Sequence, residues 1–229
     1  MPKSIARGQQ TRAANMHARR ERIYDAARRI IAVRGFDALN LRELAMAAGV
    51  TVPTIYNLIG NKSALVAQLF DETIAPFENL QYITSDNDPV ASPAEFLDRV
   101  VDVMRDNENY YRAEFLARES LTNKGDAVAL AIQERIVQIA VEACEQAKTA
   151  GLTTGDIAPK QLGTMIADHF LLAYRDWAHG KTSLEVFRDR VIAGAYICLA
   201  ADATKTYRQR IVEMLNTSPS RNLVIPLKK

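Results

Sequence analysis

The sequence contains few of the residues that form metal sites and disulfides. Its 229 residues include only two cysteines and three histidines. Cys144 and Cys198 lie in apolar helical stretches, which indicates reduced core thiols rather than a disulfide. The sequence shows no metal-ligand spacing, no nucleophile–base pair and no phosphate-binding loop. We therefore expect no enzymatic activity, no metal and no cofactor.

Long apolar runs are also missing. The longest, Val191 to Ala201, is too short to cross a bilayer. The first residues are charged and contain no apolar core of a secretory signal. The length allows one or two domains with a sizeable core. These features predict a cytoplasmic protein without a membrane partner.

Charge is unevenly distributed along the chain. Up to Leu65 there are eleven basic and four acidic residues, so this segment carries 11 − 4 = +7. The whole chain carries +2, which leaves 2 − 7 = −5 for the remainder. A basic segment joined to a mildly acidic body is typical of a nucleic-acid-binding module, although a solvated basic face has the same composition.

The segment NLRELAMAAGVTVPTIYNLIGNKSAL, residues 40–65, has the layout of a helix-turn-helix. Asn40 is a good N-cap for its first helix, with Glu43 in capping-box position. Gly49 suits the left-handed turn that follows, and Thr51 can cap the second helix. One face of the first helix carries Leu41, Leu44, Ala45 and Ala48, and one face of the second helix carries Ile55, Leu58 and Ile59. Gly60 and Asn61 then precede Lys62.

The outward side chains of this segment suit DNA. Hydroxyls and an amide can contact base edges, and a phenol and basic groups can contact phosphates. A helix-turn-helix that serves only for packing is the alternative. We expect Thr51, Val52, Thr54 and Asn57 near base edges and Arg42, Tyr56 and Lys62 near phosphates.

From about Arg22 to Leu65 the chain resembles the TetR family of bacterial transcriptional regulators. The resemblance rests on IYDAARRIIAVRGF followed by LRELAMAAGVTVPTIYNLIGNKSAL. Asn40 stands where the family usually has threonine, and Ile59 where it usually has an aromatic residue. The resemblance implies dimeric DNA binding through the second and third helices. It also implies an all-helical C-terminal domain that dimerises and binds a small molecule.

Helical patterns cover nearly the whole chain, so we predict an all-α fold. Residues 1–17 are expected to be a disordered basic arm, which either lies along DNA through Lys3, Arg7 and Arg12 or only aids solubility. A three-helix DNA-binding domain should occupy 18–65 and a larger helical effector-binding and dimerisation domain 66–229. The first helix should run from Ala18 to Arg34, with a buried face of Ile23, Ala26, Ala27, Ile30 and Val33. A turn-rich break is expected at 84–93. Later helices are expected at 62–76, 93–104, 109–121, 126–150, 159–179, 183–204 and 205–215.

Two C-terminal segments are apolar around most of their circumference, residues 165–174 and 191–201. A helix that is apolar all round must be covered on all sides. We predict that the two helices pair with their mates in a symmetric homodimer, unless both lie inside one subunit.

Ligand-binding residues are harder to predict. The candidates lie mid-helix on apolar faces, which indicates a mainly apolar or aromatic ligand. His169 is either one of them or a hydrogen-bonded core residue, and Trp177 is expected in the core. The candidates are Met104, Tyr111, Phe115, Cys144, His169, Phe170 and Tyr174.

Together these features predict a dimeric regulator that a small-molecule effector releases from a palindromic double-stranded DNA operator. Repression is the expected sign, and activation stays open. The alternative is a DNA-binding module whose body serves only for dimerisation or protein contacts, without an effector.

Overall fold

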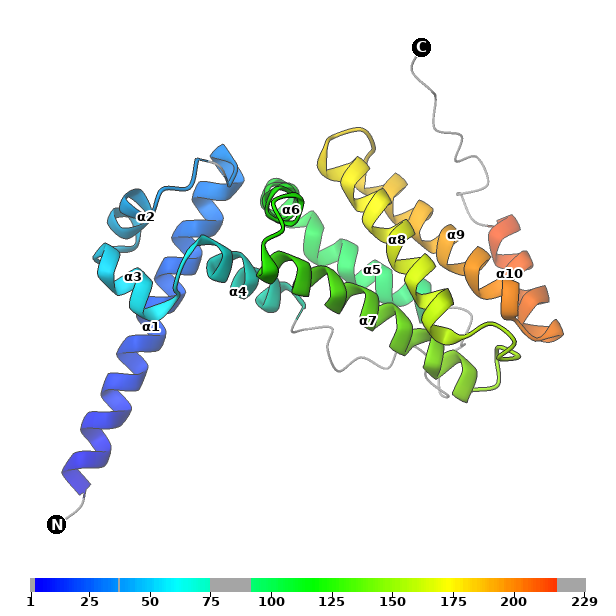
Figure 1. Ribbon diagram of the computed structural model, residues 1–229, viewed down its shortest axis with the longest axis horizontal. Helices are drawn as coiled ribbons and strands as arrows, with labels where there is room; N and C mark the ends of the chain where they lie inside the picture. Colours follow the sequence, from blue (N-terminus) through cyan, green and yellow to red (C-terminus); the bar gives the residue numbers. More distant parts are fainter. Residues whose placement is uncertain (1–2, 37, 75–91, 218–229) are drawn as a thin grey trace. The chain divides into compact units, whose positions relative to one another are not determined.

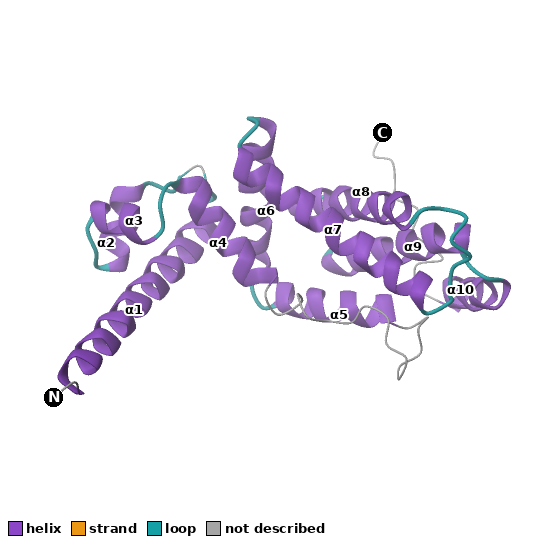
Figure 2. Cartoon of the chain, turned by 60° about the horizontal axis from the view of Figure 1, so that its bottom comes forward, coloured by secondary structure: helices purple, strands orange, loops and turns teal. Residues whose placement is uncertain are grey.

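A computed structural model describes residues 3–36, 38–74 and 92–217. Throughout these residues the regular structure is helical, as predicted, apart from an isolated bridge between Thr153 and Ala203 (Figures 1 and 2). Within them no helix is both long and apolar enough to cross a membrane. Most of the predicted break at residues 84–93 lies outside the described residues.

The chain divides into two compact units. The first, here called the head, comprises Met1–Pro76 and Asn109–Leu130. The second, the body, comprises Phe77–Glu108 and Ala131–Lys229. The head holds α1 (Lys3–Arg34), α2 (Leu41–Ala48), α3 (Val52–Leu58), α4 (Lys62–Ile74) and nearly all of α6 (Glu108–Asn123). The body holds α5 (Ser92–Arg105), most of α7 (Ala127–Thr149), α8 (Pro159–Ala178), α9 (Leu184–Asp202) and α10 (Lys205–Thr217).

The head has an apolar core built from all of its first four helices. Its fully buried side chains include Ile23, Leu44, Ile55 and Leu65, one from each of these helices. The predicted burial of Val33 is wrong, because that side chain is 81% exposed. It lies in the last turn of α1, and Ile31 is buried there in its place.

Helix α1 is longer than the sequence predicted. Its 32 residues begin at Lys3, so most of the segment expected to be a disordered arm is helical (Figure 1). This segment contains no proline after position 2 and several good helix formers, so it can continue an existing helix without a new nucleation step. The side chains of residues 14–22 are all exposed.

Helix α6 belongs to the head although it follows α5 of the body. The Ser63 hydroxyl donates to the Asp126 carboxylate at 2.6 Å, and the Arg118 guanidinium lies 5.1 Å from the Phe70 ring centroid. Arg118 and Glu114 are both buried and are paired at 3.2 Å. The division at residue 65 that the sequence predicts therefore differs from the two compact units, because the head extends through α4 and includes α6, which contacts α4.

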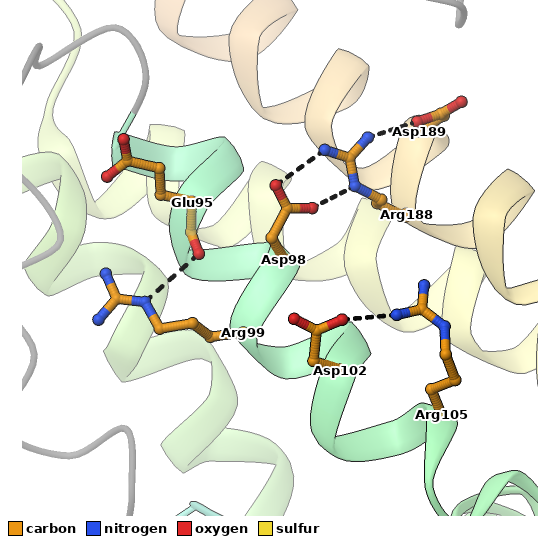
Figure 3. Close-up of polar contacts among 7 residues, drawn as sticks. All are labelled: Glu95, Asp98, Arg99, Asp102, Arg105, Arg188 and Asp189. Carbon is orange, nitrogen blue, oxygen red and sulfur yellow. Dashed lines mark hydrogen bonds and ion pairs between the residues drawn. The ribbon is translucent and has the colours of Figure 1, made fainter.

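In the body, long helices approach one another closely. Gly163 of α8 packs directly on α7, since a Cβ atom at Gly163 would lie 2.5 Å from the Cα of Val141. Between α5 and α9, Arg188 forms a two-pronged ion pair with Asp98 and also contacts Asp189 (Figure 3). These hydrogen bonds raise the pKa of Arg188, which stays charged at any physiological pH.

Asp202, a buried carboxylate, anchors the loop between α7 and α8. It accepts from the Thr154 hydroxyl at 2.7 Å and from the backbone N–H groups of Gly155 and Ile157 at 2.9 and 3.1 Å. Burial alone would raise the pKa of Asp202, but these hydrogen bonds outweigh it and the pKa is lowered. The loop is therefore tied to the end of α9 by a charged group.

Candidate nucleic-acid interface

The turn between α2 and α3 has the geometry that its sequence predicts. The Asn40 side chain accepts from the Arg42 N–H, and the Thr51 hydroxyl accepts from the Thr54 N–H. Gly49 has φ = +64°, in the left-handed region where glycine carries no steric cost. Its N–H and that of Val50 return to carbonyls of α2 and close the helix end. The caps fix where α3 begins and in which direction it leaves the turn.

The predicted base-contacting residues at the N-cap of α3 and along it all reach solvent at least in part. Ile55 is fully buried and faces the core, whereas Thr51 and Asn57 are exposed and Val52 and Thr54 partly exposed. The hydroxyls of Thr51 and Thr54 lie 2.8 Å apart and hydrogen-bond to each other. The two hydroxyls are thereby held in a defined arrangement, with lone pairs free to accept from base edges.

The predicted phosphate-contacting residues surround that surface. Tyr56 is 55% exposed and Arg42 is exposed beside the cap of α2. Lys62 is only partly exposed, and its ammonium lies 5.2 Å from the centroid of the Phe36 ring. This cation–π contact holds the first residue of α4 close to the start of the motif.

Several polar contacts that join the head helices were not predicted. Arg20 of α1 donates from Nε to the carbonyl of Leu58, the last residue of α3, at 3.0 Å. The Tyr24 hydroxyl donates to Gln68 of α4 at 3.1 Å. Ion pairs join Arg34 to Glu43 and Arg28 to Glu72. The pairing of Glu43 with Arg34 gives that carboxylate a partner on another helix, which the capping-box pattern did not suggest.

The candidate ligand residues are distributed over both units. Tyr111 and Phe115 lie on α6 in the head, while the other five lie in the body. Met104 and Cys144 are buried. Burial, with smaller effects of Cys198 and Glu145, raises the pKa of the Cys144 thiol to about 12, so this thiol is neutral and behaves as an apolar group.

An aromatic cluster in the body contains two of the candidates. The ring centroids of Phe170 and Tyr174 lie 5.6 Å apart, and each lies within 6 Å of the Phe187 centroid. Trp177 is fully buried beside them, which confirms its predicted place in the core. The cluster joins α8 to α9 through edge and tilted ring contacts.

His169 of α8 packs directly against α9. Its Nε2 lies 2.8 Å from the carbonyl oxygen of Arg190, to which the ring donates. A Cβ at Gly194 would lie 2.1 Å from the ring, so only glycine leaves room for it. This hydrogen bond gives His169 a structural partner on α9, and its role as a ligand residue stays a prediction.

The two helices predicted to dimerise carry apolar side chains that this single chain leaves uncovered. Met165 and Leu172 of α8 are 59% and 43% exposed, and Ile197 of α9 is 62% exposed. The two helices run side by side (Figure 1). Large apolar groups exposed together on neighbouring helices are typical of a surface that another molecule covers.

Residues 23–69 match the model of the family described as bacterial regulatory proteins, tetR family. A comparison with curated proteins gives no match. Solved structures that share the fold include a TetR-family transcriptional regulator from Pectobacterium atrosepticum, which is 20% identical with a TM-score of 0.62 over 84% of this chain and 97% of that one.

Two further structures with this fold carry specific names. SmeT, the repressor of the Stenotrophomonas maltophilia multidrug efflux pump SmeDEF, is 19% identical with a TM-score of 0.64 over 82% of this chain and 92% of that one. NalD, the secondary repressor of the MexAB-OprM multidrug efflux pump of Pseudomonas aeruginosa, is 16% identical with a TM-score of 0.56 over 79% and 96%. At such identities the likeness concerns the fold.

The helix-turn-helix geometry, the match over residues 23–69 and the shared fold lead to one conclusion: residues 23–69 form a DNA-binding segment of the TetR family, in a chain that has the fold of TetR-family transcriptional regulators.

Proposed function

We propose that this regulator is a dimeric repressor, released from a palindromic operator when a small, mainly apolar or aromatic molecule binds to the body. The observation that carries the DNA-reading part is the exposed side of α3, where Thr51, Thr54 and Asn57 lie opposite buried Ile55. SmeT and NalD, which share the fold and are both repressors of multidrug efflux pumps, support repression. Because its partner is chromosomal DNA, we place the protein in the cytoplasm.

Dimerisation through α8 and α9 is the second part of the proposal. The exposed Met165, Leu172 and Ile197 would be covered by the same helices of a second subunit. A twofold dimer would present two reading helices about one turn of DNA apart and so recognise a palindrome. Replacing Ile197 with Glu should convert the dimer to a monomer in sedimentation experiments and abolish preference for a palindrome.

The effector part rests on the aromatic and apolar composition of the body. The candidates are Met104, Cys144, His169, Phe170 and Tyr174, together with Tyr111 and Phe115 of α6. An effector must bind the DNA-free conformation more tightly than the DNA-bound one, otherwise it shifts no equilibrium. A thermal-shift screen with small aromatic and aliphatic compounds tests this, because a ligand of the native body raises the melting temperature. A screen without hits would favour a body that serves only for assembly.

Operator binding tests the proposal as a whole. The purified protein is titrated at several salt concentrations with an oligonucleotide that it has itself selected from a random-sequence library. We expect a palindromic selected sequence and a steep loss of affinity with salt. Failure to select any sequence would refute specific DNA reading.

Substitutions assign roles within the interface. Thr54→Ala should reduce the preference for the selected sequence over a scrambled one, because Thr54 is proposed to contact a base. Lys62→Ala should weaken binding to both DNAs and reduce the salt slope by about one. Since Lys62 also contacts Phe36, Phe36→Leu is the matched control: it removes the ring but keeps the charge, and it should leave the salt slope unchanged.

A further inference from the structure

The C-terminal end of α3 is held by a side chain from another helix. Helix α3 has only seven residues, and a helix this short has little stability of its own. The carbonyls of its last turn lack partners within the helix. Arg20 of α1 supplies one of them by donating from Nε to the Leu58 carbonyl at 3.0 Å. A cation at this end also interacts favourably with the helix dipole.

A second hydrogen bond joins α1 to α4. Tyr24 lies one turn further along α1 than Arg20; burial raises the pKa of its hydroxyl, and the nearby charge of Arg20 opposes that shift. The Tyr24 hydroxyl donates to Oε1 of Gln68 at 3.1 Å, and Gln68 donates to Asp71 at 3.3 Å. Helix α1 therefore holds the end of α3 through Arg20 and α4 through Tyr24. Tyr24 itself is buried, which fixes the contact to α4.

We infer that Arg20 and Tyr24 are positioning residues for DNA reading: from α1 they fix the end of α3 relative to α4 through these two hydrogen bonds. The inference rests on the proposed function, since α4 leads from the motif towards the rest of the chain. A movement of α4 would change the position of Gln68 and, through Tyr24 and Arg20, the orientation of α3. Arg20 then contributes to sequence preference without contacting DNA.

The alternative is that Arg20 binds a phosphate, as its charge and exposure would allow. The two roles differ in what they change. Loss of a phosphate contact weakens binding to all sequences and lowers the salt slope by about one. Loss of a positioning contact weakens binding mainly to the selected sequence and leaves the salt slope unchanged.

The test uses the full-length protein and the selected oligonucleotide, with a scrambled oligonucleotide for comparison. For Arg20→Gln we expect affinity for the selected sequence to fall about three- to tenfold, the range for one or two intramolecular hydrogen bonds, with less than about a twofold change on scrambled DNA. Arg19→Gln, the same charge change at the exposed neighbouring position, is the matched control and should leave the preference unchanged.

Two further variants make the result decisive. Arg20→Lys keeps the charge, but its flexible ammonium cannot reproduce the Nε–H that the planar guanidinium directs at the Leu58 carbonyl, so it should not restore the preference. Tyr24→Phe removes a single oxygen and should reduce the preference without any change in charge. If Arg20→Gln lowers the melting temperature strongly, the sequence preference of Tyr24→Phe decides the test instead.

Two results would overturn the inference. One is a uniform loss on both DNAs with a reduced salt slope that Arg20→Lys restores, which would make Arg20 a phosphate contact. The other is wild-type preference in Tyr24→Phe. Either leaves the proposed function intact, because that function fails only if the wild-type protein selects no sequence.

Discussion

The head and the body are held together in different ways. In the head, α2 and α3 have eight and seven residues, and side-chain hydrogen bonds and ion pairs join them to α1. In the body, α5, α7, α8 and α9 have 14 to 23 residues, and glycines allow close contact in two of the helix pairs, Gly163 with the backbone of α7 and Gly194 with the His169 ring of α8. Short helices bury little area, so they depend on caps and turns, whereas long helices depend on packing.

The largest effect should follow from breaking the close packing of the body. Gly163→Leu places a side chain where even a Cβ would lie 2.5 Å from the Val141 backbone. Overpacking of this kind costs about 3 kcal/mol of unfolding free energy, because α7 and α8 must separate. Chemical denaturation measures it, and Gln161→Ala on the exposed side of α8 is the control. A change below about 1 kcal/mol would show that this contact is not tight.

The next effect concerns the charged anchor of the body. Asp202→Ala removes the acceptor of the partly buried Gly155 and Ile157 N–H groups and leaves the Thr154 hydroxyl only Asp156 as an acceptor, and should cost about 2 kcal/mol. The pKa of Asp202 is lowered in the folded state, so its stabilisation is complete above the unfolded pKa of about 4 and is lost as pH falls through the folded value.

Denaturation at pH 7 and at about pH 2 checks both statements, since the unfolded pKa of aspartate is about 4. The stability difference between wild type and Asp202→Ala should shrink at the lower pH, because protonation weakens the anchor in the wild type. A difference that stays constant would mean that the charge of Asp202 contributes nothing.

A smaller effect is expected at the turn of the head. Gly49 has φ = +64° and open space around its Cα, so Gly49→Ala meets no clash and pays only for the left-handed backbone, about 1 kcal/mol. Gly49→Asn should cost less, because asparagine tolerates this conformation. Thermal denaturation followed by circular dichroism compares the two. Equal costs would contradict the backbone explanation.

The smallest effect should come from the exposed ion pair between α1 and α2. Both Arg34 and Glu43 remain partly exposed, and exposed ion pairs contribute about 0.5 kcal/mol or less. A double-mutant cycle with Arg34→Ala and Glu43→Ala measures the coupling, which should decrease further with added salt. A coupling above about 1 kcal/mol would show that polar ties in the head are stronger than their exposure implies.

Much of the local structure follows from short-range patterns. Caps at Asn40 and Thr51 are present as predicted, and Asn61 and Ser183 cap α4 and α9 in the same way. Cap chemistry acts over three residues, so it can be read from sequence alone. Periodicity predicted a buried Val33, but in the last turn of α1 the buried side chain is Ile31, because the packing partner covers only one side of that turn.

The contacts that arrange the helices could not be predicted in the same way. Arg20 and Leu58 are separated by 38 residues, and Arg28 and Glu72 by 44. Nothing in the local pattern distinguishes Arg20 from the exposed Arg19 beside it. Similarly, Gly163 and Gly194 are unfavourable helix residues when judged from the sequence alone. In the structure, Val141 and His169 occupy the space that a side chain at these positions would need.

The sequence by itself determined the helical fold, the position of the helix-turn-helix and the chemistry on the outer side of α3, because caps, turns and periodicity act within one or two helical turns. Only the tertiary structure decided that α6 packs with the head, that Arg20 holds the end of α3 and that two glycines bring α8 onto α7 and α9. Those features depend on side chains that meet across tens of residues, where the packing of the whole chain selects among many compatible partners.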